Sequence, residues 1–169
     1  TLVRACDMVQ PYREYKQFLQ MATWRKPGQL VLKCPEHLWF LDSLLEVFPD
    51  ACIIWTHRDP APTIASYCSL ISMQWRTLYG SFDPQELGQH ISGRFKEGVE
   101  RAMVTRERLQ QEDRFFDVRF SDLVQDQRGT VKKICQHFDL DYGDHMDGAI
   151  EEWLTSPERG DHRGAHKYS

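Results

Sequence analysis

The chain has 169 residues, which is enough for one domain with a sizeable hydrophobic core. Hydrophobic residues make up 41% of the sequence and charged residues 27%, as is ordinary for a soluble globular protein. The formal net charge of -4 argues against bulk binding to nucleic acid or to an anionic membrane, so any anion site must be local. Because the apolar runs are too short to cross a bilayer and no signal peptide is apparent, we expect a cytoplasmic protein.

The cysteines and histidines give no metal-binding pattern. The 5 cysteines are scattered, odd in number and without a CxxC pair, so we expect free, buried thiols. None of the 7 histidines falls in a ligand spacing such as HExxH, so we expect no metal.

The first part of the chain predicts a helix, a short strand and a second helix. Residues 1–26 carry a broad apolar face typical of a helix, and Pro27-Gly28 forms a turn. Residues 30–32 predict a short strand that ends at Lys33, and residues 36–47 predict a helix.

The central stretch contains the pattern on which the fold prediction depends. Residues 51–55 (ACIIW) are typical of a strand that is buried on both faces. Asp59 and Pro60 then predict a helix start, with a capping carboxylate before a first-turn proline. The later elements are predicted as a long helix over 83–111, a strand over 115–120, and two helices around 131–138 and 146–154. Strands that alternate with helices favour an α/β fold with a parallel sheet flanked by helices, here as a single domain over 1–169.

Two polar residues near the predicted central strand suggest an anion site. Arg58 follows the strand directly, and Ser66 lies roughly 10 Å along the helix axis from Asp59. In open α/β sheets, ligands bind at the carboxyl ends of strands, where helix amides also favour an anion. Arg58 and Ser66 can therefore hold one phosphate. The alternative is structural: an ion pair between Arg58 and Asp59, and a serine that fills a small gap.

Lys33 and His37 form a second candidate group, at the end of one predicted strand and the start of the next helix. A histidine there can act as a general base, and a lysine can neutralise charge on a transferring group. The alternative is a partly exposed histidine and a solvated lysine. A phosphate-binding loop of the type GxxxxGK[ST] is absent from these residues, and HRD at 57–59 lacks the rest of a kinase pattern.

The residues LVLKCPEHLWFLDSLLEVFPDACIIWTHRDPAPTIASYCSL resemble the strand-to-helix region of the bacterial sulfotransferases that use 3'-phosphoadenosine-5'-phosphosulfate. FFDVRFSDLVQDQRGTVKKICQHFDL and RGDHRGAHKYS are similar to later segments of that family. The resemblance implies a P-loop-type fold without its N-terminal strand and phosphosulfate loop, so that the chain is expected to be the C-terminal part of a sulfotransferase domain. A fragment of this kind would leave a sheet edge unpaired.

The resemblance also implies a role for each candidate residue. Arg58 and Ser66 would bind the 3'-phosphate of the donor, and Phe120 stands where many relatives have a tyrosine beside the adenine. His37 would deprotonate the acceptor and Lys33 would stabilise the transferring sulfuryl group, while Arg163 and Gly164 would close over the 3'-phosphate. His37 follows Lys33 by four residues, with Pro35 between, whereas cytosolic relatives have the histidine two residues after the lysine.

The expected reaction is sulfuryl transfer to a hydroxyl or amine of a small-molecule, lipid or carbohydrate acceptor, without a metal. Two alternatives stay open: a non-catalytic module that binds the donor or its product adenosine 3',5'-bisphosphate, and a structural domain that reuses the fold. The sequence is also compatible with a homo-oligomer.

Overall fold

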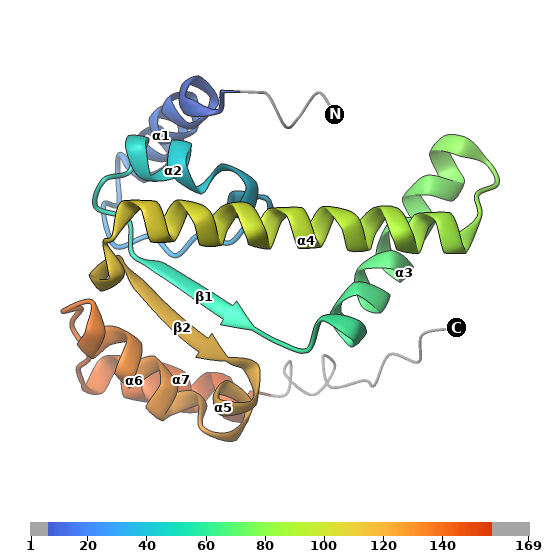
Figure 1. Ribbon diagram of the computed structural model, residues 1–169. Helices are drawn as coiled ribbons and strands as arrows, with labels where there is room; N and C mark the ends of the chain where they lie inside the picture. Colours follow the sequence, from blue (N-terminus) through green and yellow to red (C-terminus); the bar gives the residue numbers. More distant parts are fainter. Residues whose placement is uncertain (1–6, 157–169) are drawn as a thin grey trace. The chain divides into compact units, whose positions relative to one another are not determined.

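The computed structural model describes residues 7–156 (Figure 1). These residues divide into two compact units. Of the described residues, we call 7–51 with 92–111 the helical unit, and 52–91 with 112–156 the sheet unit. The elements in chain order are α1 (Val9–Thr23), η2 (Pro35–Phe40), α2 (Leu41–Val47), β1 (Ile53–His57), α3 (Pro60–Tyr79), α4 (Pro84–Leu109), η3 (Glu112–Arg114), β2 (Phe115–Arg119), α5 (Phe120–Gln125), α6 (Gln127–His137) and α7 (Asp144–Thr155).

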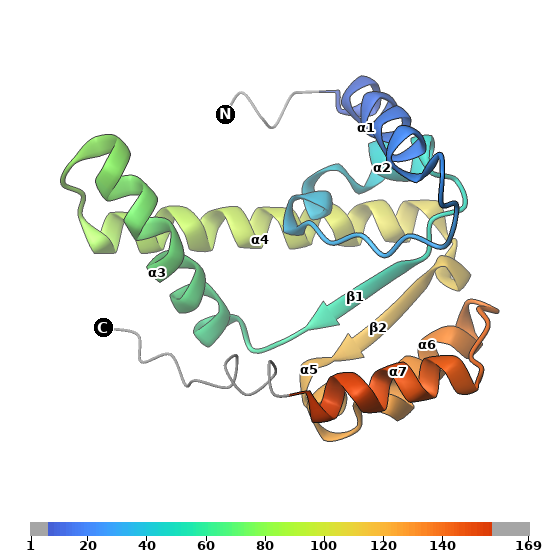
Figure 2. The ribbon, with the colours of Figure 1, turned by 180° about the vertical axis from the view of Figure 1, so that it is seen from behind.

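The sheet of the described residues pairs β1 with β2 in parallel, which confirms the predicted strand direction. The register runs from Ile53 opposite Phe115 to His57 opposite Arg119. Figures 1 and 2 show the two arrows side by side and pointing the same way, with α6 and α7 next to β2. The carboxyl ends of both strands therefore lie together, followed by α3 after β1 and by α5 after β2.

Apolar side chains of β2 are well buried, whereas β1 is more exposed than its sequence predicted. Phe115 and Val118 are each 3% exposed, and the Phe116 ring lies 5.2 Å from the His137 ring of α6, centroid to centroid. Ile54 is 45% exposed. The strand predicted at 51–55 starts and ends two residues later, and the expectation that both its faces are buried was wrong for Ile54. In residues 7–156, β1 has one strand neighbour, so one of its edges stays unpaired.

The strand predicted over residues 30–32 is absent from the described structure, where this segment has no regular secondary structure. Leu30, Val31 and Leu32 are 39%, 88% and 46% exposed. A strand needs backbone hydrogen bonds to a neighbour, and the sheet of the described residues contains β1 and β2. The local sequence therefore favours a strand, but in the described part of the chain no neighbouring strand pairs with residues 30–32.

The core of the helical unit is formed by α1, η2, α2 and the part of α4 that belongs to this unit. Its buried hydrophobic residues are Tyr12, Trp39, Phe40, Leu41, Leu44, Leu45, Val47 and Ala102. The Trp39 ring meets the Phe95 ring edge to face, with centroids 6.5 Å apart, and the Arg94 guanidinium lies 5.3 Å from the Trp39 ring. The helix predicted over 36–47 is present, but its first part is the 3-10 helix η2.

Gly98 lets α4 approach Trp39 closely, because a methyl group at Gly98 would lie 2.6 Å from Trp39 Cε2. We expect Gly98→Ala to lower the free energy of unfolding by about 1–3 kcal/mol, the range for overpacking a core. Gly93→Ala on the same helix is the matched control, since a Cβ there meets nothing within 4 Å. That substitution should raise stability by about 0.5–1 kcal/mol through helix propensity alone. Denaturant titration of both variants measures the effect, and changes of the same sign would contradict the close contact.

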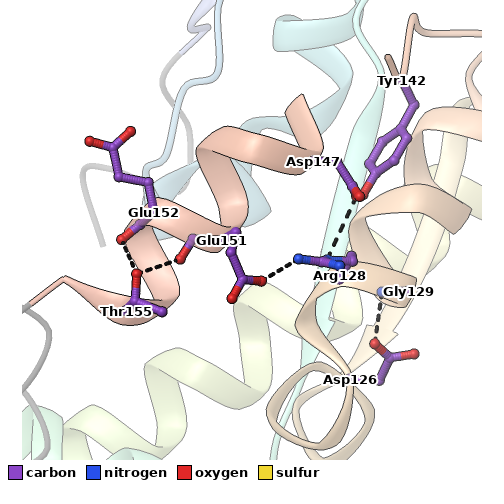
Figure 3. A network of polar contacts seen from close by, with 8 residues as sticks. All are labelled: Asp126, Arg128, Gly129, Tyr142, Asp147, Glu151, Glu152 and Thr155. Carbon is purple, nitrogen blue, oxygen red and sulfur yellow. Dashed lines mark hydrogen bonds and ion pairs between the residues drawn. The ribbon is translucent and has the colours of Figure 1, made fainter. Parts of the chain in front are cut away.

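A polar network joins α6 to α7 in the sheet unit (Figure 3). Arg128 pairs with Glu151, and its Nε lies 3.7 Å from Asp147 Oδ1. The Tyr142 hydroxyl donates to Asp147 Oδ1 at 2.6 Å, and this hydrogen bond raises the pKa of Tyr142. Asp126 caps α6 by accepting the Gly129 N–H at 2.8 Å. These contacts link α6 to α7, the two helices that lie next to β2.

Arg128→Ala should lower the free energy of unfolding by about 0.5–1 kcal/mol, because its partners are partly solvated. The effect should shrink in 1 M salt, where the screening length is about 3 Å. Lys133→Ala, an exposed change on the same helix, is the control and should stay near zero. A salt-independent loss in thermal denaturation would indicate that Arg128 contributes packing rather than charge.

Candidate functional site

The carboxyl end of the sheet brings Arg58 and Phe120 together. Arg58 directly follows β1, and Phe120 directly follows β2. His57, the last residue of β1, lies opposite Arg119, the last residue of β2, so Arg58 and Phe120 leave the sheet at the same end. The Arg58 guanidinium lies over the Phe120 ring, 4.4 Å from the ring centroid. This cation–π contact orients a planar set of donors at the strand ends.

The N-terminus of α3 is capped as the sequence predicted, but it offers few free amides. Asp59 Oδ1 accepts the Ala61 N–H at 2.9 Å, and Thr63 Oγ1 donates to the Asp59 carbonyl at 2.8 Å. Pro60 and Pro62 carry no N–H. An anion here would therefore be bound mainly by side chains, rather than by helix amides as the sequence suggested. Ser66 lies farther along α3 and is half-buried.

A histidine–aspartate pair on the sheet was not predicted from the sequence. His57 Nε2 lies 2.6 Å from Asp117 Oδ1, and both side chains are partly exposed. The Trp55 ring stacks on His57 with an interplanar angle of 16° and a centroid distance of 5.7 Å. Alternation along each strand places these side chains on one face of the sheet. The sequence does not give the register between the strands, and that register is what brings His57 and Asp117 together.

His37 occupies a half-buried position on η2 in the helical unit, four residues after the exposed Lys33. Its Nδ1 lies 2.8 Å from the hydroxyl of Tyr12, a buried residue of α1. Burial lowers the pKa of His37, so the imidazole is neutral at pH 7 and able to take a proton. Burial also raises the pKa of Tyr12 to about 12, so its phenol stays protonated. Tyr12 falls within the apolar face predicted for residues 1–26, a pattern that does not reveal its polar contact with His37.

Arg163 and Gly164 lie outside the described residues. Within residues 7–156, no group of three or more His, Cys, Asp or Glu side chains is arranged to hold a metal ion. The same part of the chain contains no helix that is both long and apolar enough for a membrane span. Cys34 and Cys52 are free and exposed, so the expectation of buried thiols was wrong for these two.

The sequence-family comparison matches residues 4–144 to the Sulfotransferase family. The chain belongs to this family. Among curated relatives, it is 29% identical over 126 residues to the omega-hydroxy-beta-dihydromenaquinone-9 sulfotransferase Stf3 of Mycobacterium bovis and to that of Mycobacterium tuberculosis. Each match covers 73% of this chain and 32% of the relative, so the chain spans about a third of the length of these relatives.

Two solved sulfotransferase structures share the fold. Sulfotransferase STF9 from Mycobacterium avium has a TM-score of 0.83 and 27% sequence identity, and the match covers 98% of this chain and 41% of that one. Sulfotransferase STF1 from Mycobacterium tuberculosis has a TM-score of 0.77 and 26% identity, over 96% of this chain and 46% of that one. The predicted fold class, a sulfotransferase-like α/β fold, is confirmed by these matches.

Proposed function

We propose that the protein transfers a sulfuryl group from 3'-phosphoadenosine-5'-phosphosulfate to a hydroxyl or amine of an acceptor. The observation that supports this most directly is the Arg58 guanidinium held over Phe120 at the carboxyl end of β1, in a chain of the sulfotransferase family. A positively charged guanidinium at the carboxyl ends of parallel strands is suited to bind an anionic nucleotide.

We assign the 3'-phosphate of the donor to Arg58 and Ser66. The phosphate is doubly charged near neutral pH, and the capped, proline-rich start of α3 supplies few amides to bind it. A guanidinium that is already oriented by an aromatic ring loses little freedom when it binds. One face of Phe120 carries this guanidinium, and the adenine is assigned to the other face. Arg163 and Gly164 are proposed to add contacts to the same phosphate.

His37 and Lys33 are assigned to the transfer step. As the acceptor oxygen or nitrogen forms its bond to sulfur, the bond from sulfur to the phosphate oxygen of the donor breaks, and adenosine 3',5'-bisphosphate leaves. The acceptor's proton passes to the neutral imidazole of His37. The Lys33 ammonium compensates negative charge on the transferring group. The reaction as proposed requires no metal.

The acceptor class is proposed from the relatives. Stf3 is named for a hydroxylated menaquinone derivative, and we infer that this protein also sulfates a hydroxyl on a small or lipid-like molecule. We place the reaction in the cytoplasm, in keeping with the exposed free thiols.

A transfer assay tests the proposal. The full-length protein is incubated with donor labelled in the sulfuryl group and with hydroxylated quinol, sterol and sugar acceptors. We expect label in at least one acceptor and thermal stabilisation by adenosine 3',5'-bisphosphate. Stabilisation without transfer to any acceptor would favour a non-catalytic binding module. If the bisphosphate does not stabilise the protein and no acceptor is labelled, a structural domain would be favoured. Either result would contradict the proposed activity.

A further inference from the structure

The contact between Tyr12 and His37 is selective for one nitrogen of the imidazole. The hydroxyl lies 2.8 Å from Nδ1, and the two rings are tilted by 45° with centroids 5.7 Å apart. Tyr12 is 6% exposed and His37 is half-buried, so this hydrogen bond is partly shielded from water. Nε2 is consequently the ring nitrogen left for a substrate.

The hydrogen bond determines whether Nε2 can act as a base. A neutral imidazole carries one hydrogen, on either Nδ1 or Nε2. When Nδ1 donates its hydrogen to the tyrosine oxygen, Nε2 has a free lone pair and can take a proton. When the tyrosine donates to Nδ1 instead, Nε2 carries the hydrogen and cannot. A partner at the second nitrogen is the usual way in which a functional histidine is oriented.

We propose that Tyr12 is a positioning residue for His37: its oxygen accepts the Nδ1 hydrogen, fixes the ring, and leaves Nε2 to take the acceptor's proton. This inference rests on the proposed function, because it assigns Tyr12 a role in the same transfer step. When Nε2 gains the proton, the Nδ1–H···O hydrogen bond becomes charge-assisted and stabilises the imidazolium. Tyr12 itself neither gains nor loses a proton in this step.

Nitrogen NMR of the protein labelled with 15N-histidine tests the tautomer without any need for turnover. The His37 signals are identified by their loss in His37→Gln. We expect the wild-type signals to report hydrogen on Nδ1 and a lone pair on Nε2, and Tyr12→Phe to shift this population towards hydrogen on Nε2. Tyr15→Phe is the matched control, because Tyr15 is a half-buried residue of the same helix whose ring packs on Phe48. It should leave the His37 signals unchanged.

Kinetics provide the second measurement. Tyr12→Phe should lower kcat by roughly 10- to 100-fold with KM nearly unchanged, whereas Tyr15→Phe should retain kcat. Wild-type hydrogen on Nε2, or identical His37 signals and kcat in Tyr12→Phe, would overturn the role of Tyr12. The wild-type tautomer decides the question even if Tyr12→Phe does not fold. A wild-type protein that transfers sulfate to no acceptor would instead overturn the proposed function, which is a separate result from the tautomer.

Discussion

His37→Ala is expected to lower kcat for sulfuryl transfer by about 10²–10⁴-fold, the usual contribution of a general base. The side chain removed is the neutral imidazole that we assign to the acceptor's proton, and burial keeps its pKa below the ordinary value of 6.5. Because His37 has no assigned role in donor binding, the affinity for adenosine 3',5'-bisphosphate should change by less than about twofold. Initial rates with labelled donor, together with calorimetric titration of the bisphosphate, measure both quantities.

His145→Ala provides the control for this experiment, because His145 is exposed on α7 and has no role in the proposed reaction. It should retain wild-type kcat and bisphosphate affinity. Turnover that persists in His37→Ala would remove His37 as the base. A fall in bisphosphate affinity as large as the fall in kcat would mean that the substitution damages the donor site or the fold, rather than the proton transfer.

Arg58→Ala is expected to weaken the binding of adenosine 3',5'-bisphosphate by about 1.5–3 kcal/mol, the range for a hydrogen bond to a charged group. This corresponds to a roughly 10- to 150-fold higher Kd. The substitution removes both the charge at the carboxyl end of β1 and the guanidinium that lies 4.4 Å from the Phe120 ring centroid. Calorimetric titration measures the change.

Two further variants show whether the geometry or only the charge of Arg58 is needed. Arg58→Lys keeps the positive charge but loses the planar fork and its stacking on Phe120, so an intermediate Kd is expected. Arg76→Ala removes an exposed arginine in the last turn of α3 and should bind as the wild type does. Equal weakening in Arg58→Ala and Arg76→Ala would indicate a general electrostatic effect instead of a site.

Much of the fold follows from local sequence signals. The Asp59-Pro60 helix start and the long α4 were predicted because capping residues and apolar periodicity act within a few turns. Pairing between strands is not a local property. Residues 30–32 have strand composition but no strand partner in the described structure. Burial of a strand's faces depends on which elements pack against them, and Ile54 of β1 is 45% exposed.

The candidate site was predictable one residue at a time, but not as an arrangement. Arg58 and His37 were selected as candidates from their positions at the ends of predicted elements. The contact of Arg58 with Phe120 depends on strand register, and that of His37 with Tyr12 joins two helices distant in sequence. Tyr12 in particular looks like an ordinary core residue, since its spacing fits the apolar face of α1. Only the folded structure, in which Tyr12 of α1 lies beside His37 of η2, shows that the tyrosine hydroxyl contacts the histidine.

The preference for a 3'-phosphate tests the central assignment most directly. Calorimetry would compare adenosine 3',5'-bisphosphate with adenosine 5'-phosphate, which lacks that group, in the wild type and in the Arg58→Ala/Ser66→Ala double variant. We expect the wild type to bind the bisphosphate more tightly and the double variant to lose most of this preference, while its affinity for adenosine 5'-phosphate changes little. A double variant that discriminates between the two nucleotides as well as the wild type would show that Arg58 and Ser66 do not hold the 3'-phosphate.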